Sequence, residues 1–171
     1  TQGTCSPLVV GDTVYVRGMP NGKSAPQVLE AHRLSFAGDT VTAERLWSAA
    51  KVGMPNRSPV IHDDLLYHVI EGDSKAKTNP GLLVYKASDG SVVGTVDFTF
   101  KVGGHPNLAV TDSGLVVNWV EGGFAFFSFG EKPELKAQTR IQPAPCYAQP
   151  FYHEGRIFVR SMDALYCIDG K

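Results

Sequence analysis

The stretch Ser58-Pro59-Val60-Ile61-His62-Asp63-Asp64-Leu65-Leu66-Tyr67 decides the fold, because the chain contains four versions of it. The other three versions begin at Ser6, Asn107 and Gln149. Each version has an anchor residue near its start, and the anchors Pro7, Pro59, Asn107 and Pro150 are 52, 48 and 43 residues apart. A period of this length is typical of solenoids and propellers, so the chain is predicted to be a repeat protein.

Each version predicts a β-hairpin, because a short apolar run leads into a turn such as Asp63-Asp64 or Glu154-Gly155 and a second run rich in β-branched and aromatic residues follows. A third run comes after a connector, as at 81–86, and three of the repeats continue into a fourth run, as at 91–97. Four antiparallel strands per repeat make one propeller blade. The predicted fold class is therefore all-β, a β-propeller to which this chain supplies about four blades.

The blades are expected to form a single partial propeller domain over 1–171, with repeats at approximately 4–52, 53–101, 102–143 and 144–171. The fourth repeat stops at Asp169-Gly170-Lys171, where the turn into its outer strand is expected. The five residues from Thr1 to Cys5 are too few to supply that strand. We therefore expect the remainder of the propeller to lie upstream of Thr1 and to pack against this part.

Composition excludes some classes of partner. The chain has 16 basic and 17 acidic residues in 171, mixed along its length, so no charge pattern for nucleic-acid binding is present. No apolar stretch approaches the roughly 18 to 20 residues of a transmembrane helix. The three cysteines lack the paired short spacing of a zinc site, so no metal ligands are predicted. In an exported protein Cys146 and Cys167 could form a disulfide, whereas free buried thiols are an equal alternative.

The strand sequence Leu82-Leu83-Val84-Tyr85-Lys86-Ala87-Ser88-Asp89-Gly90-Ser91-Val92-Val93, together with the Ser-Pro starts of the repeats, resembles the quinoprotein-like (pyrroloquinoline quinone repeat) β-propellers. The ending at 165–171 is similar to the C-terminal blade of bacterial members of that superfamily. The resemblance covers essentially the whole chain. It implies a ring of seven or eight blades and an exported protein located in the periplasm or outside the cell.

The resemblance also bears on cofactors. Quinone-dependent dehydrogenases of the superfamily end most blades with a Trp that packs the ring together, and here only Trp47 occupies that place, with Val96 and Thr139 or its neighbours in the next two repeats. The vicinal cysteines and the Asn and Asp calcium pair of those enzymes have no counterpart that we can place. We therefore expect no cofactor and no catalytic residue. The alternative is pyrroloquinoline quinone with calcium.

Candidate binding residues lie where the chain enters the innermost strands, on the propeller face that also carries the second-to-third-strand loops and that we call the top face. Side chains converge there on the central channel, and loops on a rigid scaffold are where binding residues concentrate. The alternative is that these polar groups satisfy backbone groups or channel water. The predicted ligand-binding residues are Asn56, Arg57, His105, Asn107, Tyr147 and Gln149.

Three functions are compatible with these features. The first is a non-catalytic propeller whose top face binds a protein, peptide or carbohydrate. The second is the C-terminal part of a quinone- and calcium-dependent alcohol or sugar dehydrogenase, with the catalytic Asp and calcium ligands upstream of Thr1. The third follows from a resemblance to the outer-membrane assembly lipoproteins of Gram-negative bacteria, and is an envelope scaffold for protein assembly. Fold analogy alone does not choose among them.

Overall fold

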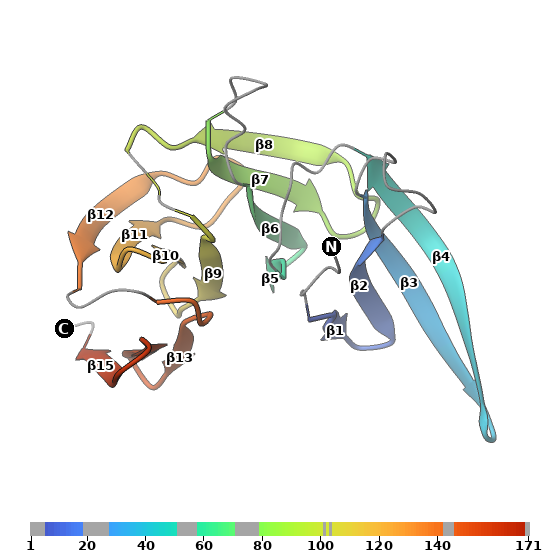
Figure 1. Cartoon of the computed structure of the whole chain (residues 1–171). Helices are drawn as coiled ribbons and strands as arrows, with labels where there is room; N and C mark the ends of the chain where they lie inside the picture. The colour runs from blue at the N-terminus through green and yellow to red at the C-terminus, as the bar shows by residue number, and fades with distance from the viewer. Residues whose placement is uncertain are drawn as a thin grey trace.

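The computed structural model describes residues 6–18, 28–50, 58–70, 79–100, 102, 104–141 and 146–169, which form four antiparallel sheets. We call these sheets blades 1 to 4, and they follow one another along an arc (Figure 1). No helix occurs among these described residues, and none of them forms a helix with the length and hydropathy needed to span a membrane.

Each blade is a meander in which neighbouring strands in sequence are hydrogen-bonded neighbours in space. Blades 1 to 3 have four strands and blade 4 has three in the described part of the chain. Blade 1 comprises β1 (Leu8–Val10), β2 (Thr13–Gly18), β3 (Val28–Ala37) and β4 (Thr40–Ala50); blade 2 comprises β5 (Val60–His62), β6 (Leu65–Ile70), β7 (Gly81–Lys86) and β8 (Val92–Asp97). Blade 3 comprises β9 (Asn107–Val110), β10 (Leu115–Trp119), β11 (Gly123–Phe127) and β12 (Leu135–Arg140); blade 4 comprises β13 (Phe151–His153), β14 (Arg156–Arg160) and β15 (Leu165–Asp169).

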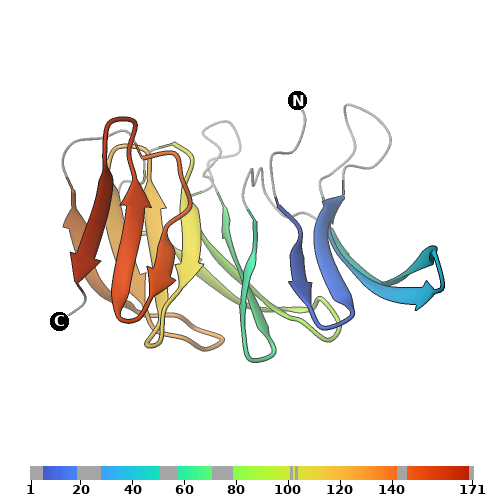
Figure 2. The same ribbon diagram turned by 90° about the horizontal axis from the view of Figure 1, so that it is seen from below.

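The first hairpins of blades 1, 2 and 4 are closed by residues that accept a left-handed backbone, with Gly11 at φ 61° in blade 1. In blade 4 Glu154 has φ 48° and Gly155 has φ 78°, the pair of positive values that a type I′ turn requires. In blade 2 Asp63 has φ 51°, a conformation that Asp tolerates better than most residues. Figure 2 shows all four of these turns on the same side, which we call the bottom face, opposite the top face.

A β-bulge recurs at one place in each four-stranded blade, between the third and fourth strands. The register shifts between Ala31 and His32, between Val84 and Tyr85, and between Phe126 and Phe127. Bulges increase local twist, which suits outer strands that splay away from the propeller axis. The shared bulge also aligns the blades residue by residue. Ala31 pairs with Trp47, and the residues that correspond to Trp47 in blades 2 and 3 are Gly94 and Ala137.

The core is a set of apolar layers between consecutive blades, because each sheet alternates side chains between its two faces. Between blades 1 and 2 the layer includes Tyr15, Leu29, Trp47, Leu66 and Tyr85. The layer between blades 2 and 3 contains Tyr67, Leu82, Leu115, Trp119 and Phe127, and that between blades 3 and 4 contains Val116, Phe124, Cys146, Ile157 and Val159. Burial of these side chains at roughly 25 cal/mol per Å² holds the arc together.

Blade 1 docks on blade 2 through one kind of contact, and blade 2 docks on blade 3 through another. The Trp47 indole lies over Gly90 of blade 2 and its Nε1 donates a 2.9 Å hydrogen bond to the Ala87 carbonyl oxygen. In blade 2 the place of Trp47 belongs to Gly94, not to Val96, and in blade 3 it belongs to Ala137, not to Thr139. Val96 and Thr139, named from the sequence, instead correspond to Ala49, two residues further along the fourth strand. At Gly94 the absence of a side chain lets the Glu131 carbonyl of blade 3 approach the backbone.

The β3–β4 hairpin extends beyond its own blade. β2 pairs with β3 only as far as Arg33, whereas β3 and β4 stay paired to Ala37 and Thr40. The result is a two-stranded ribbon that projects from blade 1 (Figure 1). Near its tip Phe36 pairs with Val41, and both side chains are exposed.

Candidate binding site

Four of the six predicted top-face residues lie together at the junction of blades 3 and 4. Asn56 and Arg57 fall outside the described residues. His105 precedes β9 and Asn107 begins it, while Tyr147 and Gln149 lead towards β13. The two strand starts are adjacent because β9 and β13 are in contact.

Two of the predicted residues use their amides to join the two blades. Asn107 is buried, and its Nδ2 donates to the carbonyl oxygens of Tyr147 at 3.3 Å, His105 at 3.4 Å and Ala148 at 3.5 Å. Gln149 Nε2 donates to the Leu108 carbonyl oxygen at 2.7 Å. These bonds satisfy backbone carbonyls, which is the structural role that the sequence left open as the alternative. They make the junction a rigid platform.

Asn118 adds to this platform from β10, where it pairs with Asn107. Its Nδ2 donates to the Ala148 carbonyl oxygen at 3.4 Å, whereas its buried Oδ1 has no hydrogen-bond partner among the described residues. An asparagine in the second strand of a blade gave no signal in the sequence, because the partner carbonyl is supplied by another blade.

The other two predicted residues face solvent on this platform. Tyr147 is 53% exposed, and its ring centroid lies 6.2 Å from that of His105. His105 is also exposed and has φ 57°, a left-handed conformation that is uncommon outside glycine and that clusters at functional sites. An imidazole and a phenol are thus presented side by side.

A small cavity of about 130 Å³ adjoins Tyr147. It is lined by Tyr147, Ala148, Arg160, Ser161 and Met162. Met162 is 75% exposed and sits in the connection between β14 and β15, which Ser161 orders by accepting hydrogen bonds from the amides of Asp163 and Ala164. Arg160 and Met162 are not among the residues predicted from the sequence; the short Ser161-Met162-Asp163 turn is the signal that points to them, because Ser favours such turns.

A second cavity, of about 290 Å³, lies on the bottom face of the same junction. Its lining includes Tyr152, Glu154, Arg156 and Asp169. The Tyr152 hydroxyl donates to Asp112 Oδ2 at 2.5 Å, and this hydrogen bond raises the pKa of Tyr152. None of the residues predicted to bind a ligand lines this cavity.

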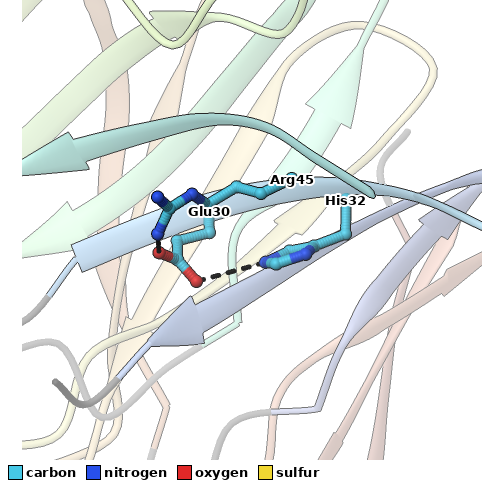
Figure 3. A network of polar contacts seen from close by, with 3 residues as sticks. All are labelled: Glu30, His32 and Arg45. Atoms are coloured by element: carbon cyan, nitrogen blue, oxygen red, sulfur yellow. Dashed lines mark hydrogen bonds and ion pairs between the residues drawn. The ribbon is translucent and has the colours of Figure 1, made fainter. Parts of the chain in front are cut away.

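A polar network occupies the face of blade 1 that points away from blade 2 (Figure 3). Glu30 accepts hydrogen bonds from His32 Nε2 at 3.1 Å and from Arg45 Nη1 at 3.3 Å. Burial alone would raise the pKa of Glu30, but the hydrogen bonds and charges of His32 and Arg45 outweigh it, so the pKa lies below its usual value.

Cys146 and Cys167 are both free thiols in the structure. Cys146 is buried in the layer between blades 3 and 4, whereas Cys167 is exposed on β15, so the Cys146–Cys167 disulfide is not formed and only one of the two free thiols is buried. The thiols lie on opposite sides of blade 4, because Cys167 pairs with Phe158 on the face away from blade 3. Burial and the Asp163 charge raise the pKa of Cys146. Cys5 lies outside the described residues.

Among the described ranges, no three His, Cys, Asp or Glu side chains come together in a way that could hold a metal ion.

Comparison with known proteins identifies the fold. No model of a known protein family matches the chain, and no curated protein matches it. The crystal structure of BamB from Moraxella catarrhalis, a β-propeller, superposes with a TM-score of 0.66 at 11% identity, over 98% of this chain and 46% of that one. The computationally designed Ika8 protein gives a TM-score of 0.42 at 10% identity, over 96% of this chain and 70% of that one. The chain thus spans about half the length of the BamB chain, and the predicted propeller of about four blades is confirmed.

Proposed function

We propose that the chain belongs to a quinoprotein-like propeller that binds a protein or peptide on its top face and catalyses no reaction. The observation that carries this proposal is the exposed group His105, Tyr147 and Met162 beside the cavity at the junction of blades 3 and 4. We call these three residues the top-face patch.

The platform under the patch is pre-organised. Asn107, Asn118 and Gln149 fix the backbone that carries Tyr147 by hydrogen bonds to carbonyls of both blades. A ligand that binds Tyr147 therefore meets a surface whose backbone is already ordered, and the entropy lost on binding is smaller.

The chemistry of the patch favours a protein surface over a small substrate. Tyr, Met and Arg are enriched at protein interfaces, and a large exposed Met adapts to partners of different shape. Arg160, at the edge of the cavity, adds a fork of hydrogen-bond donors for a carboxylate. A cavity of about 130 Å³ is smaller than the roughly 300 to 1,000 Å³ of most small-molecule pockets, but it suits one anchoring side chain.

Each alternative function requires a different experimental result. A carbohydrate ligand would stack on Tyr147, so it shares the site with a peptide and is distinguished by a glycan array. The dehydrogenase alternative requires turnover of an alcohol or sugar when quinone and calcium are added. The envelope-scaffold alternative requires capture of purified barrel-assembly components. We propose a periplasmic or extracellular location, as the sequence resemblance implies.

The test is a selection of peptides from a random-peptide phage library on the immobilised chain, followed by affinity measurement of the enriched peptides. The variants Tyr147→Ala and Met162→Ala are expected to weaken binding at least about tenfold, since exposed aromatic anchors dominate such interfaces. Phe36→Ala and Leu135→Ala remove exposed apolar groups elsewhere and serve as matched controls.

Peptides that bind the patch variants and the parent chain equally would contradict the proposal. Quinone-dependent turnover of an alcohol or a sugar would replace it with the dehydrogenase. Binding on the glycan array that is lost in Tyr147→Ala, without any enriched peptide, would change the ligand class from peptide to carbohydrate.

A further inference from the structure

The cavity of about 290 Å³ at the junction of blades 3 and 4 has no part in the proposed peptide binding. It lies on the bottom face, where the first turns of the two blades are neighbours (Figure 2). Thr111 and Ser113 line it from the β9–β10 turn, and Glu154 and Gly155 line it from the β13–β14 turn. Its volume is near the lower end of the roughly 300 to 1,000 Å³ of small-molecule pockets, so it suits a small ligand or one long side chain.

The β9–β10 turn is longer than the first turns of the other blades. It comprises residues 111–114, whereas each of the other first turns comprises two residues. The Thr111 hydroxyl donates to the Gly114 carbonyl oxygen at 3.0 Å and accepts from the Ser113 amide at 3.3 Å. The additional residues therefore form an ordered wall of the cavity that the shorter turns do not build.

A hydrogen bond joins the two sides of the cavity. The Tyr152 hydroxyl, from β13, donates to Asp112 Oδ2 in the β9–β10 turn at 2.5 Å. Because the two residues belong to different blades, the bond fixes the distance between the walls. A carboxylate has about four acceptor positions and Tyr152 occupies one of them, so Asp112 can also accept hydrogen bonds from a ligand.

The lining that faces the blade interface is apolar. Phe126 and Ile157 line the cavity and belong to the layer between blades 3 and 4, and Ile157 is only 4% exposed. The ring of Tyr152 packs in the same layer. The cavity thus combines an apolar interior with polar turns at its edge, and a ligand that matches both has an apolar stem and a polar head.

The charge of the bottom face indicates the charge of that head. In a meander the third-to-fourth-strand turns lie on the same face as the first turns. Together the described turns of this face contain nine acidic residues and one basic residue, Lys132. The acidic residues are Asp12, Asp39, Asp63, Asp64, Asp89, Asp112, Glu131, Glu134 and Glu154. The resulting negative potential attracts cations and raises their local concentration.

The charges at the cavity itself favour the same sign. Arg156 and Asp169 line it as partners in register across β14 and β15, so their opposite charges offset each other. The carboxylates of Glu154 and Asp112 remain. The Glu154 side chain is 83% exposed, and the nearest printed cationic group, His153 Nε2, is 3.8 Å away, which is too long for a hydrogen bond. An ammonium or guanidinium group therefore suits this edge.

We propose that the cavity binds an alkyl cation, which is an apolar stem that ends in an ammonium or guanidinium group. The stem packs on Phe126 and Ile157, and Glu154 and Asp112 accept hydrogen bonds from the head. Such a group is supplied by a lysine or arginine side chain of a partner protein or by a free alkylamine. The inference does not rest on the peptide binding proposed for the top face, because no residue of the top-face patch lines this cavity.

Titration of the isotope-labelled chain, followed by NMR at the amides of Ser113, Gly155 and Ile157, tests the proposal. The probe is N-acetyl-arginine amide. Methylguanidinium has the head without the stem, and N-acetyl-norleucine amide has the stem without the head. We expect saturable shifts with the arginine probe and at least about tenfold weaker binding of the other two, because each loses either the apolar or the charged contacts.

Glu154→Lys is expected to weaken binding of the arginine probe at least about tenfold, because it places a cation beside the head. Glu131→Lys makes the same charge change in another exposed turn of the bottom face and is the matched control. It should change the affinity less than about twofold, since salt screens exposed charges that do not touch the ligand.

A short alanine peptide with one central arginine distinguishes the two sources of the ligand. Tighter binding than that of N-acetyl-arginine amide assigns the cavity to a side chain of a partner protein, whereas equal or weaker binding assigns it to a free cation. The proposal is overturned if no shift saturates at millimolar concentration, or if Glu131→Lys weakens binding as much as Glu154→Lys does. Shifts confined to Tyr147 and Met162 would also overturn it, because the probe would then occupy the top-face patch.

Discussion

Trp47 of blade 1 and Ala87 of blade 2 are joined by a 2.9 Å hydrogen bond from the indole Nε1 to the backbone carbonyl oxygen. The two residues are 40 positions apart, and Trp47 is 9% exposed. The contact therefore combines apolar burial with a buried polar bond, and it fixes how blade 1 sits on blade 2. The Trp packing that the sequence resemblance implies is present here at one interface.

Replacing Trp47 with Phe keeps an aromatic ring but removes the donor to Ala87. The free energy of unfolding is expected to fall by about 2 to 4 kcal/mol, since a buried carbonyl loses its partner and the smaller ring leaves a cavity. Chemical denaturation measures the change. Trp119→Phe, in the layer between blades 2 and 3, is the control for ring size, and an equal loss in both variants would contradict a special role for the hydrogen bond.

Gly90 is expected to tolerate no side chain, because two separate effects act there. Its φ is 72°, and a Cβ would lie 2.5 Å from the Trp47 ring. Gly38 has a similar φ of 58° with nothing within 4 Å of the Cβ position, so it isolates the backbone effect. Gly38→Ala is expected to cost about 1 kcal/mol. Gly90→Ala is expected to cost about 1 to 3 kcal/mol more, because the added methyl group overpacks the interface.

The hydroxyl of Tyr67 accepts a 2.9 Å hydrogen bond from the Gly130 amide and so joins blades 2 and 3. Burial raises the pKa of Tyr67, which keeps the phenol neutral at physiological pH. Tyr67→Phe leaves the amide without this partner and is expected to destabilise the fold by about 1 to 2 kcal/mol. Native-state hydrogen exchange of the Gly130 amide gives a direct readout, and unchanged protection there would contradict the assignment.

The blades can be predicted from the sequence because a hairpin is encoded locally. Alternating apolar residues around a turn such as Glu154-Gly155 are enough to place two strands, and the four-fold period does the rest. The docking at Gly94 is not encoded locally. It depends on Glu131 of the next blade, which meets Gly94 only in the folded arc.

The candidate binding site can likewise be predicted from the sequence only in part. The sequence places His105, Asn107, Tyr147 and Gln149 on the top face, because topology alone fixes which end of a strand they occupy. It does not separate the buried amides from the exposed rings, since the carbonyl partners of Asn107 and Gln149 lie about 40 residues away. A single sequence carries no record of such contacts between blades.

Glu30 is expected to make stability depend on acid pH. Its pKa lies below the usual 4.5, so the stabilisation from its charged form is complete above that value and is lost as the pH falls through the folded pKa. The difference in unfolding free energy between the parent chain and Glu30→Gln should therefore shrink as the pH is lowered below about 4.5. Glu134→Gln, at a fully exposed carboxylate paired with Lys136, is the control and should show a weaker trend. A constant difference would contradict the ion network.

The two described thiols are expected to react very differently with a thiol reagent under native conditions. Cys167 is exposed on β15 and should be modified at once, whereas Cys146 is buried with a raised pKa, so both access and thiolate content are low. The experiment uses a Cys5→Ser background, so that only these thiols report, and a denaturant should then release Cys146 for modification. Two thiols that resist the reagent until a reductant is added would instead establish the Cys146–Cys167 disulfide, which requires blade 4 to repack because the structure holds the thiols on opposite sides of its sheet.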